Sequence, residues 1–238
     1  MHRDFASPEA RLQSRPRDYR NMTDIAVLLS GGIDSAVLLC ELVARGETVH
    51  PLYVRCGLRW EADELASIRQ LLAETAALNL RQLTILDAPV ADLYGEHWSI
   101  TGGGVPDEAT DDDAVYLPGR NVLLLSKSML WCHLHGVPAV ALAVLSGNPF
   151  PDSTPQFIAG LEGVINRAVD GAVRVHCPYS ALSKRDVLAR SNGVPLALTH
   201  SCLRSIDGHH CGRCNKCAER QKAFAAVGRM DPTVYAAD

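Results

Sequence analysis

The residues best suited to chemistry stand in a short glycine turn that follows an apolar run. The run covers residues 25–29 (IAVLL), and a second apolar stretch begins at residue 36. Between them lie Ser30, Gly31, Gly32, Ile33, Asp34 and Ser35. A strand, a glycine turn and a helix N-terminus in succession point backbone N–H groups at an anion, because adjacent glycines let the main chain approach closely. The sequence therefore predicts a phosphate-binding turn at residues 30–35, to which the serine hydroxyls add donors.

This glycine turn differs from the mononucleotide P-loop, which needs a lysine beside its Ser or Thr. The first lysine of the chain is Lys127. An ordinary turn whose helix is capped by Asp34 or Ser35 is the alternative interpretation. The turn resembles the SGGxDS loop of the ATP-pyrophosphatase superfamily, and that resemblance implies a protein that binds ATP and splits it to AMP and pyrophosphate.

Four cysteines near the C-terminus have the spacing of a metal site, C-x8-C-x2-C-x2-C. They are Cys202, Cys211, Cys214 and Cys217. Four thiolates this close can surround one tetrahedral Zn²⁺ and leave no open position, which predicts a structural zinc ion. The alternatives are an iron–sulfur cluster, a pair of disulfides, or three cysteines completed by a histidine from 200, 209 or 210. The other cysteines (40, 56, 132 and 177) lie within or beside apolar runs, which favours buried core thiols.

Composition places the chain among globular proteins. Of its 238 residues, 47% are hydrophobic and 21% are charged. The net charge of −4 argues against a stable nucleic-acid partner. The sequence has no window of eighteen apolar residues and no signal-peptide core, so we expect a cytoplasmic protein without a membrane partner. We predict a flexible, arginine-containing arm at residues 1–22, an ATP-pyrophosphatase domain at 23–198 and a zinc-binding helical subdomain at 199–238.

Apolar strand patterns alternate with helical patterns along most of the chain. We expect strands at 25–29, 48–54, 82–86, 138–145 and 173–176, and helices at 34–45, 61–78, 120–135, 156–169, 183–191 and from about 215. This alternation predicts an α/β fold, a doubly wound parallel sheet whose ligands bind beyond the carboxyl ends of the strands. Residues 88–119 form the one long irregular segment. Its aspartate triplet at 111–113 is either a Mg²⁺ site or, as is more common, a solvated acidic run.

Two further motifs narrow the resemblance to a family. Residues 116–121 (YLPGRN) are similar to a V-P-x-R-N segment, and residues 211–220 (CGRCNKCAER) match a CGxCxxCxxR ending. With the glycine turn and the cysteines, these motifs occur in order over roughly residues 24–228. The chain thereby resembles the 7-cyano-7-deazaguanine synthase family of queuosine biosynthesis.

The resemblance implies a C–N ligase that uses ATP, Mg²⁺ and a structural Zn²⁺ ion. ATP would adenylate the carboxylate of 7-carboxy-7-deazaguanine, and ammonia would displace AMP to give an amide. A second adenylation and an elimination would yield the nitrile. Residues 30–35 would hold pyrophosphate, with Asp34 as a helix cap or Mg²⁺ contact, while Arg120 and Lys184 would neutralise phosphates or the substrate carboxylate. A homodimer is also expected from the family.

The segment at residues 150–157 (FPDSTPQF) departs from the family pattern, which has Tyr-Pro-Asp-Cys-Arg before Glu-Phe. Here Ser153 and Thr154 replace the thiol and the arginine, and the loss of an arginine removes a bidentate partner for a carboxylate or a purine edge. The candidate substrate contacts are Asn121, Pro151, Asp152 and Ser153. A relative that stops at the amide, or that joins the acyl group to another amine, is therefore an alternative function.

Two further function classes compete with this interpretation. One is an enzyme with the same glycine turn that modifies tRNA directly, against which stand the net charge and the lack of an RNA-binding domain. The other is a zinc-ribbon interaction module whose glycine turn is an anion-binding relic. The intact turn at residues 30–35 predicts measurable ATP binding, which separates the enzymes from the module.

Overall fold

The structure is a computed structural model that describes residues 24–236, so the arm predicted at residues 1–22 lies outside the described residues. Its centre is a five-stranded sheet in the order β3-β2-β1-β4-β5, and every neighbouring pair of strands is parallel. The strands are β1 (Asp24–Leu28), β2 (Thr48–Arg55), β3 (Thr84–Asp87), β4 (Ala139–Ala141) and β5 (Arg174–His176). The predicted α/β class with a parallel sheet is confirmed.

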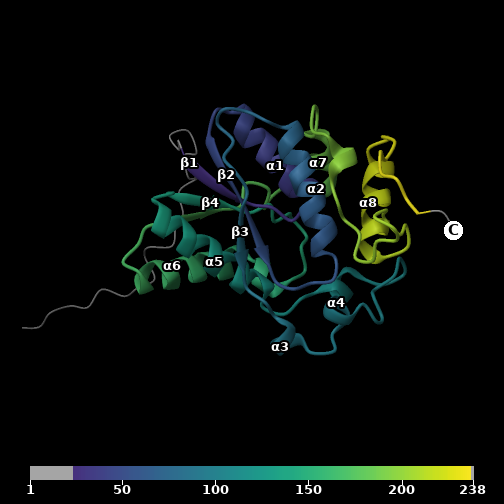
Figure 1. Cartoon of the computed structure of the whole chain (residues 1–238), viewed down its shortest axis with the longest axis horizontal. Helices are drawn as coiled ribbons and strands as arrows, with labels where there is room; N and C mark the ends of the chain where they lie inside the picture. The colour runs from purple at the N-terminus through teal and green to yellow at the C-terminus, as the bar shows by residue number, and fades with distance from the viewer. Residues whose placement is uncertain (1–23, 237–238) are drawn as a thin grey trace, which may run out of the picture.

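Helices cover both faces of this sheet (Figure 1). The longer helices are α1 (Ile33–Ala44), α2 (Glu61–Glu74), α5 (Arg120–His135), α6 (Pro155–Ala168), α7 (Lys184–Ala189) and α8 (Asn215–Ala226). The side chains of β1 alternate between two hydrophobic clusters, as the period of a strand requires. Ala26 and Leu28 face the cluster with α5 and α6, whereas Ile25 and Val27 face the one with α1, α2, α7 and α8.

Three expected elements differ from the structure. The second helix ends at Glu74 rather than residue 78, and Leu78 is fully exposed, so no core holds a further turn. Strand β4 covers only residues 139–141 of the expected 138–145, because the chain leaves the sheet after Leu142 donates its N–H to the His176 carbonyl. The segment at 88–119 contains the short helices α3 (Ala91–Tyr94), α4 (Trp98–Thr101) and η3 (Asp112–Val115).

The strand order places a topological switch beside β1. Strand β2 follows β1 on one side, and β4 enters on the other side after a long crossover. At such a point the loops that leave the two strands diverge and open a crevice beyond their carboxyl ends. The glycine turn leaves β1 there, and the segment that begins at residue 142 leaves β4 there.

The C-terminal segment packs onto the sheet domain rather than standing apart. Cys202, Leu203 and Cys217 belong to the same hydrophobic cluster as Leu28 of the sheet, and α7 lies against α8. The boundary between residues 198 and 199 stays a prediction. Among residues 24–236, none of the helices is long and apolar enough to cross a membrane.

Candidate active site and metal centre

The glycine turn is held in shape by its own serines. The Ser30 N–H donates to Ser35 Oγ at 3.2 Å, and Ser35 Oγ donates to the Gly32 carbonyl at 3.2 Å. Gly31 has a φ of +75°, and a Cβ atom there would lie 3.2 Å from the carbonyl oxygen of Glu64. Only glycine meets both demands, since L side chains are strained at positive φ. Helix α1 begins with Gly32 as its N-cap and has no side-chain cap, so Asp34 does not cap it.

Asp34 instead forms an ion pair with Lys184, which opens helix α7. Lys184 Nζ lies 2.6 Å from Asp34 Oδ2 and 3.6 Å from Glu219 Oε1, and Glu219 Oε2 is 2.7 Å from Lys216 Nζ. Burial opposes the charge on Lys184, but the two carboxylates outweigh it and raise the pKa of this amine. Lys184 therefore stays protonated beside the glycine turn, and the network extends onto α8.

A cavity of about 510 Å³ opens over the glycine turn, at the switch point of the sheet. Seven of the predicted site residues line it: Ser30, Gly32, Ile33, Asp34, Arg120, Lys184 and Cys202. Its wall also includes Trp60, Glu64 and Trp98, which sequence analysis did not single out. Phe150, Lys216 and Glu219, from the segments 150–157 and 211–220 quoted above, complete this part of the wall. The volume falls in the range of about 300–1,000 Å³ that is typical of small-molecule sites. The cavity is large enough for a nucleotide-sized ligand.

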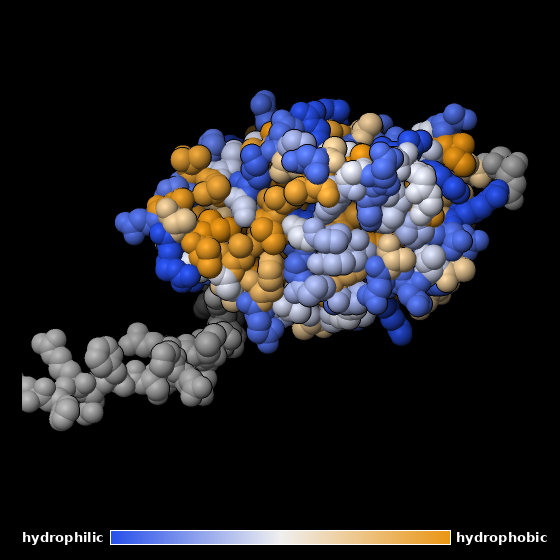
Figure 2. Space-filling model, turned by 90° about the horizontal axis from the view of Figure 1, so that it is seen from below, coloured by the Kyte–Doolittle hydropathy of each residue, from blue (hydrophilic) through white to orange (hydrophobic). Residues whose placement is uncertain are grey.

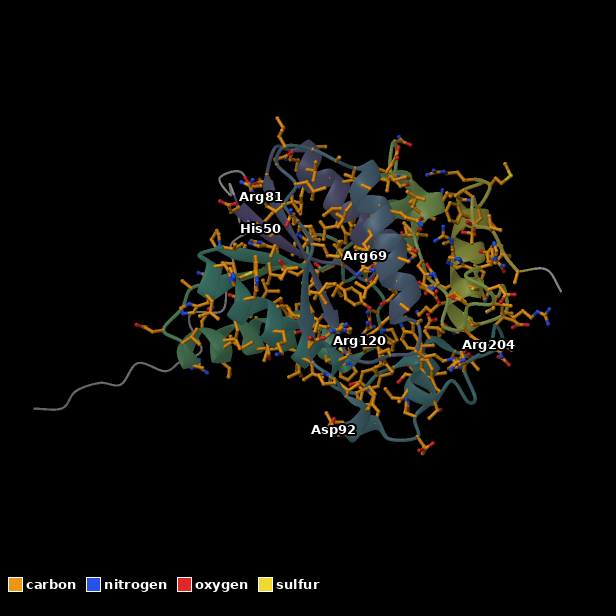
Figure 3. The ribbon with its side chains drawn as sticks, in the orientation of Figure 1. His50, Arg69, Arg81, Asp92, Arg120 and Arg204 are labelled. Carbon is orange, nitrogen blue, oxygen red and sulfur yellow. The ribbon has the colours of Figure 1, made fainter. Side chains whose placement is uncertain are left out.

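Arg120 is a cation in the wall of this cavity, and its charge opposes the rise that burial causes in the pKa of Glu64 on the same wall. It begins helix α5, and its buried Nε atom has no hydrogen-bond partner among the described residues. Figure 3 shows Arg120 near the centre of the molecule, between the sheet and the segment that carries α3 and α4. A guanidinium in such a place fits a carboxylate or phosphate, since it can donate two parallel hydrogen bonds.

Two tryptophans form an aromatic wall on the side of α2 and α4. The rings of Trp60 and Trp98 are stacked, with their centroids 5.6 Å apart and an angle of 20° between the planes. Both residues line the cavity together with Phe150. Flat aromatic surfaces of this kind favour a planar heterocyclic ligand through offset stacking.

The predicted substrate residues Asn121, Asp152 and Ser153 make hydrogen bonds within their own two segments. Asn121 donates its backbone N–H to Asp152 Oδ2 at 3.1 Å and its side-chain amide to the Asp152 carbonyl at 3.2 Å. Ser153 Oγ donates to the Phe150 carbonyl at 2.6 Å. In the described part of the chain, the cavity is lined by the preceding residues 143 and 145–150, and Asn121, Pro151, Asp152 and Ser153 do not line it.

The four C-terminal cysteines meet in one buried cluster. The ligand atoms of Cys202, Cys211, Cys214 and Cys217 all lie within 4.8 Å of one another. Cys211 Sγ and Cys217 Sγ are 4.0 Å apart, as are Cys202 Sγ and Cys214 Sγ. A tetrahedral ion with M–S bonds of about 2.3 Å separates its sulfurs by about 3.8 Å. The cluster therefore fits a metal ion held by four thiolates, and the disulfide alternative is wrong because every one of these cysteines is free.

Backbone donors surround the sulfurs of this cysteine cluster. The Cys211 N–H donates to Cys202 Sγ at 3.2 Å, and the Leu203 N–H donates to Cys214 Sγ at 3.4 Å. Such bonds stabilise thiolate charge and orient the ligands around an ion. The histidine alternative finds no support in the described residues, where the metal-ligating group consists of the four cysteines alone.

Arg220 joins the cluster to the rest of the chain. Its side chain is almost fully buried and donates to Thr199 Oγ1 at 2.8 Å and to the Leu196 carbonyl at 2.9 Å. Asp231 Oδ1 balances its charge at 3.2 Å. Arg220 therefore fixes helix α8, which carries Lys216 and Glu219, against the segment that leads to the cysteines.

The fold and the site define an α/β protein with a glycine turn and a cavity at the switch point of its parallel sheet, and with a cysteine cluster fit for a metal ion. The model of the family described as queuosine biosynthesis protein QueC matches residues 24–228, and the chain belongs to this family.

Curated relatives of this chain carry the name 7-cyano-7-deazaguanine synthase. The relative from Xylella fastidiosa (strain M12) is 33% identical over 231 residues, which cover 90% of this chain and 96% of the relative. The relative from Thiobacillus denitrificans is 34% identical over 221 residues, with 88% and 97% covered. The family resemblance inferred from the motifs is confirmed.

Proposed function

We propose that this chain converts 7-carboxy-7-deazaguanine, ATP and ammonia to 7-cyano-7-deazaguanine through adenylation of the carboxylate. The observation that carries this proposal is a single cavity that joins the glycine turn, two lysines, an arginine whose Nε atom has no hydrogen-bond partner among the described residues, and an aromatic wall. The name of the relatives supports the choice of substrate.

In this proposal the glycine turn binds the phosphates of ATP. The N–H groups at the start of α1 would hold the β and γ phosphates of ATP, and Lys184 and Lys216 would neutralise the charge that moves onto pyrophosphate. Asp34 Oδ1 is buried and has no hydrogen-bond partner within residues 24–236, which fits a contact to the Mg²⁺ ion that accompanies ATP. That ion would stabilise negative charge on the phosphates.

In this proposal Arg120 and the two tryptophans bind the deazapurine substrate and its carboxylate. Trp60 and Trp98 would stack on the planar deazapurine ring, and Arg120 would bind its carboxylate so that an oxygen faces the α-phosphate of ATP. Such positioning lowers the barrier because the reacting oxygen and phosphorus are held together. The carboxylate becomes reactive once its oxygen can leave as AMP.

In the cysteine cluster, Zn²⁺ held by Cys202, Cys211, Cys214 and Cys217 would be structural, since four thiolates complete its coordination. Elemental analysis of the purified protein would identify the metal.

A homodimer would use the exposed side chains of Leu130, Leu134 and Val164 on α5 and α6, where Figure 2 shows hydrophobic residues gathered at the left. Light scattering of Leu134→Lys against the parent protein would test this.

The activity test is incubation with ATP, Mg²⁺, ammonium and 7-carboxy-7-deazaguanine, followed by mass spectrometry of the products. Nitrile together with AMP and pyrophosphate supports the proposal, while the absence of AMP with this substrate overturns it.

The replacement of Cys and Arg by Ser153 and Thr154 favours a second candidate, an enzyme that stops at the amide or uses another amine. Amide as the final product would support that candidate. Undiminished turnover of Ser153→Ala would exclude Ser153 as a stand-in for the missing thiol.

A further inference from the structure

Glu64 is a carboxylic acid in the cavity wall, and the steps proposed above assign it no role. It lies in the first turn of α2 and is only 6% exposed. The backbone of Glu64 approaches Gly31 so closely that a Cβ there would lie 3.2 Å from the Glu64 carbonyl oxygen. Glu64 thus stands directly beside the turn at which the phosphates of ATP would bind.

The surroundings of Glu64 hold one carboxylate oxygen in place and make the group easy to protonate. The Tyr53 hydroxyl, from β2, donates to Glu64 Oε2 at 2.6 Å. Burial raises the pKa of Glu64 to about 7, against the lowering effects of Arg120 on α5 and of the Tyr53 hydrogen bond, and with a smaller raising effect from Glu61. A group with such a pKa exchanges protons readily at neutral pH.

The amine that attacks an acyl adenylate must first lose a proton. At neutral pH ammonia is present mainly as ammonium, which has no lone pair with which to attack carbon. A basic group in the cavity would remove this obstacle, and a buried carboxylate with one oxygen fixed by a hydrogen bond is suited to the task.

We propose that Glu64 is the general base that deprotonates the amine nucleophile in the second half of the reaction. An N–H bond of ammonium breaks and an O–H bond forms at the Glu64 carboxylate. The freed lone pair attacks the carbonyl carbon, and the bond from that carbon to the AMP oxygen breaks with its electron pair on AMP. The nitrogen loses a further proton to solvent to give the neutral amide. Glu64 then returns its proton to solvent.

This inference rests on the proposed function, and its test separates the two half reactions. Carboxylate-dependent exchange of pyrophosphate into ATP reports adenylation, and mass spectrometry reports amide. In Glu64→Gln we expect unchanged exchange and amide formation from ammonium slowed by about 10²- to 10⁴-fold, the usual contribution of a general base. Hydroxylamine is already unprotonated at neutral pH, so it should restore acyl transfer in the variant to within a few-fold of the parent rate.

Each other result overturns a distinct claim. Amide formation at the parent rate in Glu64→Gln, or no rescue by hydroxylamine, excludes Glu64 as the base. Loss of pyrophosphate exchange in the variant assigns Glu64 to adenylation instead. Absence of exchange in the parent protein overturns the proposed function and the base assignment together. Glu74→Gln, at the exposed end of the same helix, is the matched control and should retain both half reactions.

Discussion

The backbone N–H of His200 donates a hydrogen bond to the carbonyl oxygen of Gly31 at 2.8 Å. His200 lies two residues before Cys202, the first ligand of the cysteine cluster, and Gly31 is the central glycine of the turn. This hydrogen bond therefore connects the segment that leads into the cysteine cluster to the predicted phosphate-binding turn. We expect a change in the cysteine cluster to alter ATP binding at the turn.

Removal of the metal should weaken ATP binding as well as stability. Cys217→Ser deletes one of four ligands, and helix α8 with Lys216 and Glu219 loses its anchor. We expect a lower melting temperature and at least tenfold weaker ATP binding by calorimetry. Cys40→Ser, a half-buried thiol outside the cluster, should leave ATP affinity unchanged. Intact ATP affinity in a metal-free protein would contradict this coupling.

Gly31→Ala should abolish ATP binding because it adds backbone strain and crowding together. A residue other than glycine at φ +75° costs about 1–2 kcal/mol of folding free energy. The new Cβ would also press on the Glu64 carbonyl at 3.2 Å and displace the turn. Gly136→Ala is the matched control, since Gly136 has a φ of +68° with nothing within 4 Å of a Cβ. Gly31→Ala should lose at least as much stability in denaturant as Gly136→Ala, because it adds the contact with Glu64, and only Gly31→Ala should lose ATP binding.

Lys184→Met should weaken ATP binding by more than tenfold. The substitution leaves the Asp34 and Glu219 carboxylates without their shared cation, so that both repel the triphosphate. Lys222→Met removes an exposed lysine of α8 and should change neither ATP affinity nor turnover. Equal ATP affinities of the two variants would show that Lys184 has only a structural role.

Amide formation should depend on pH through Glu64. Its raised pKa of about 7 means that the carboxyl is mostly protonated below pH 7 and is ionised above it. At a fixed total ammonium concentration, the parent rate should rise with pH and level off above about pH 7. In Glu64→Gln only free ammonia can react, so the rate should keep rising tenfold per pH unit well into the alkaline range. Identical pH–rate profiles of the parent and of Glu64→Gln would argue against Glu64 as the general base.

The geometry of the glycine turn and of the cysteine cluster could be predicted from the sequence because both depend on local patterns. The apolar run before Ser30, the adjacent glycines and the cysteine spacing each specify their own structure within a few residues. The rest of the cavity wall could not be predicted in this way. Trp60 and Trp98 stack across a segment with no strong pattern, and Lys184 meets Asp34 across 150 positions of sequence. Only the packed fold reveals such pairs. In the sequence Glu64 has the pattern of an ordinary charged helix residue, and only the fold places Tyr53 and Gly31 beside it.

The brevity of β4 has a consequence for how this family can diversify. Only residues 139–141 of this part of the chain pair within the sheet. The segment between β4 and β5 is therefore not bound to a strand register. Substitutions in the segment 145–150 can therefore reshape this part of the cavity wall without disturbing the strand that positions the glycine turn. Under the proposed function, such substitutions would change which acceptor the cavity admits and would leave the phosphate-binding turn unchanged.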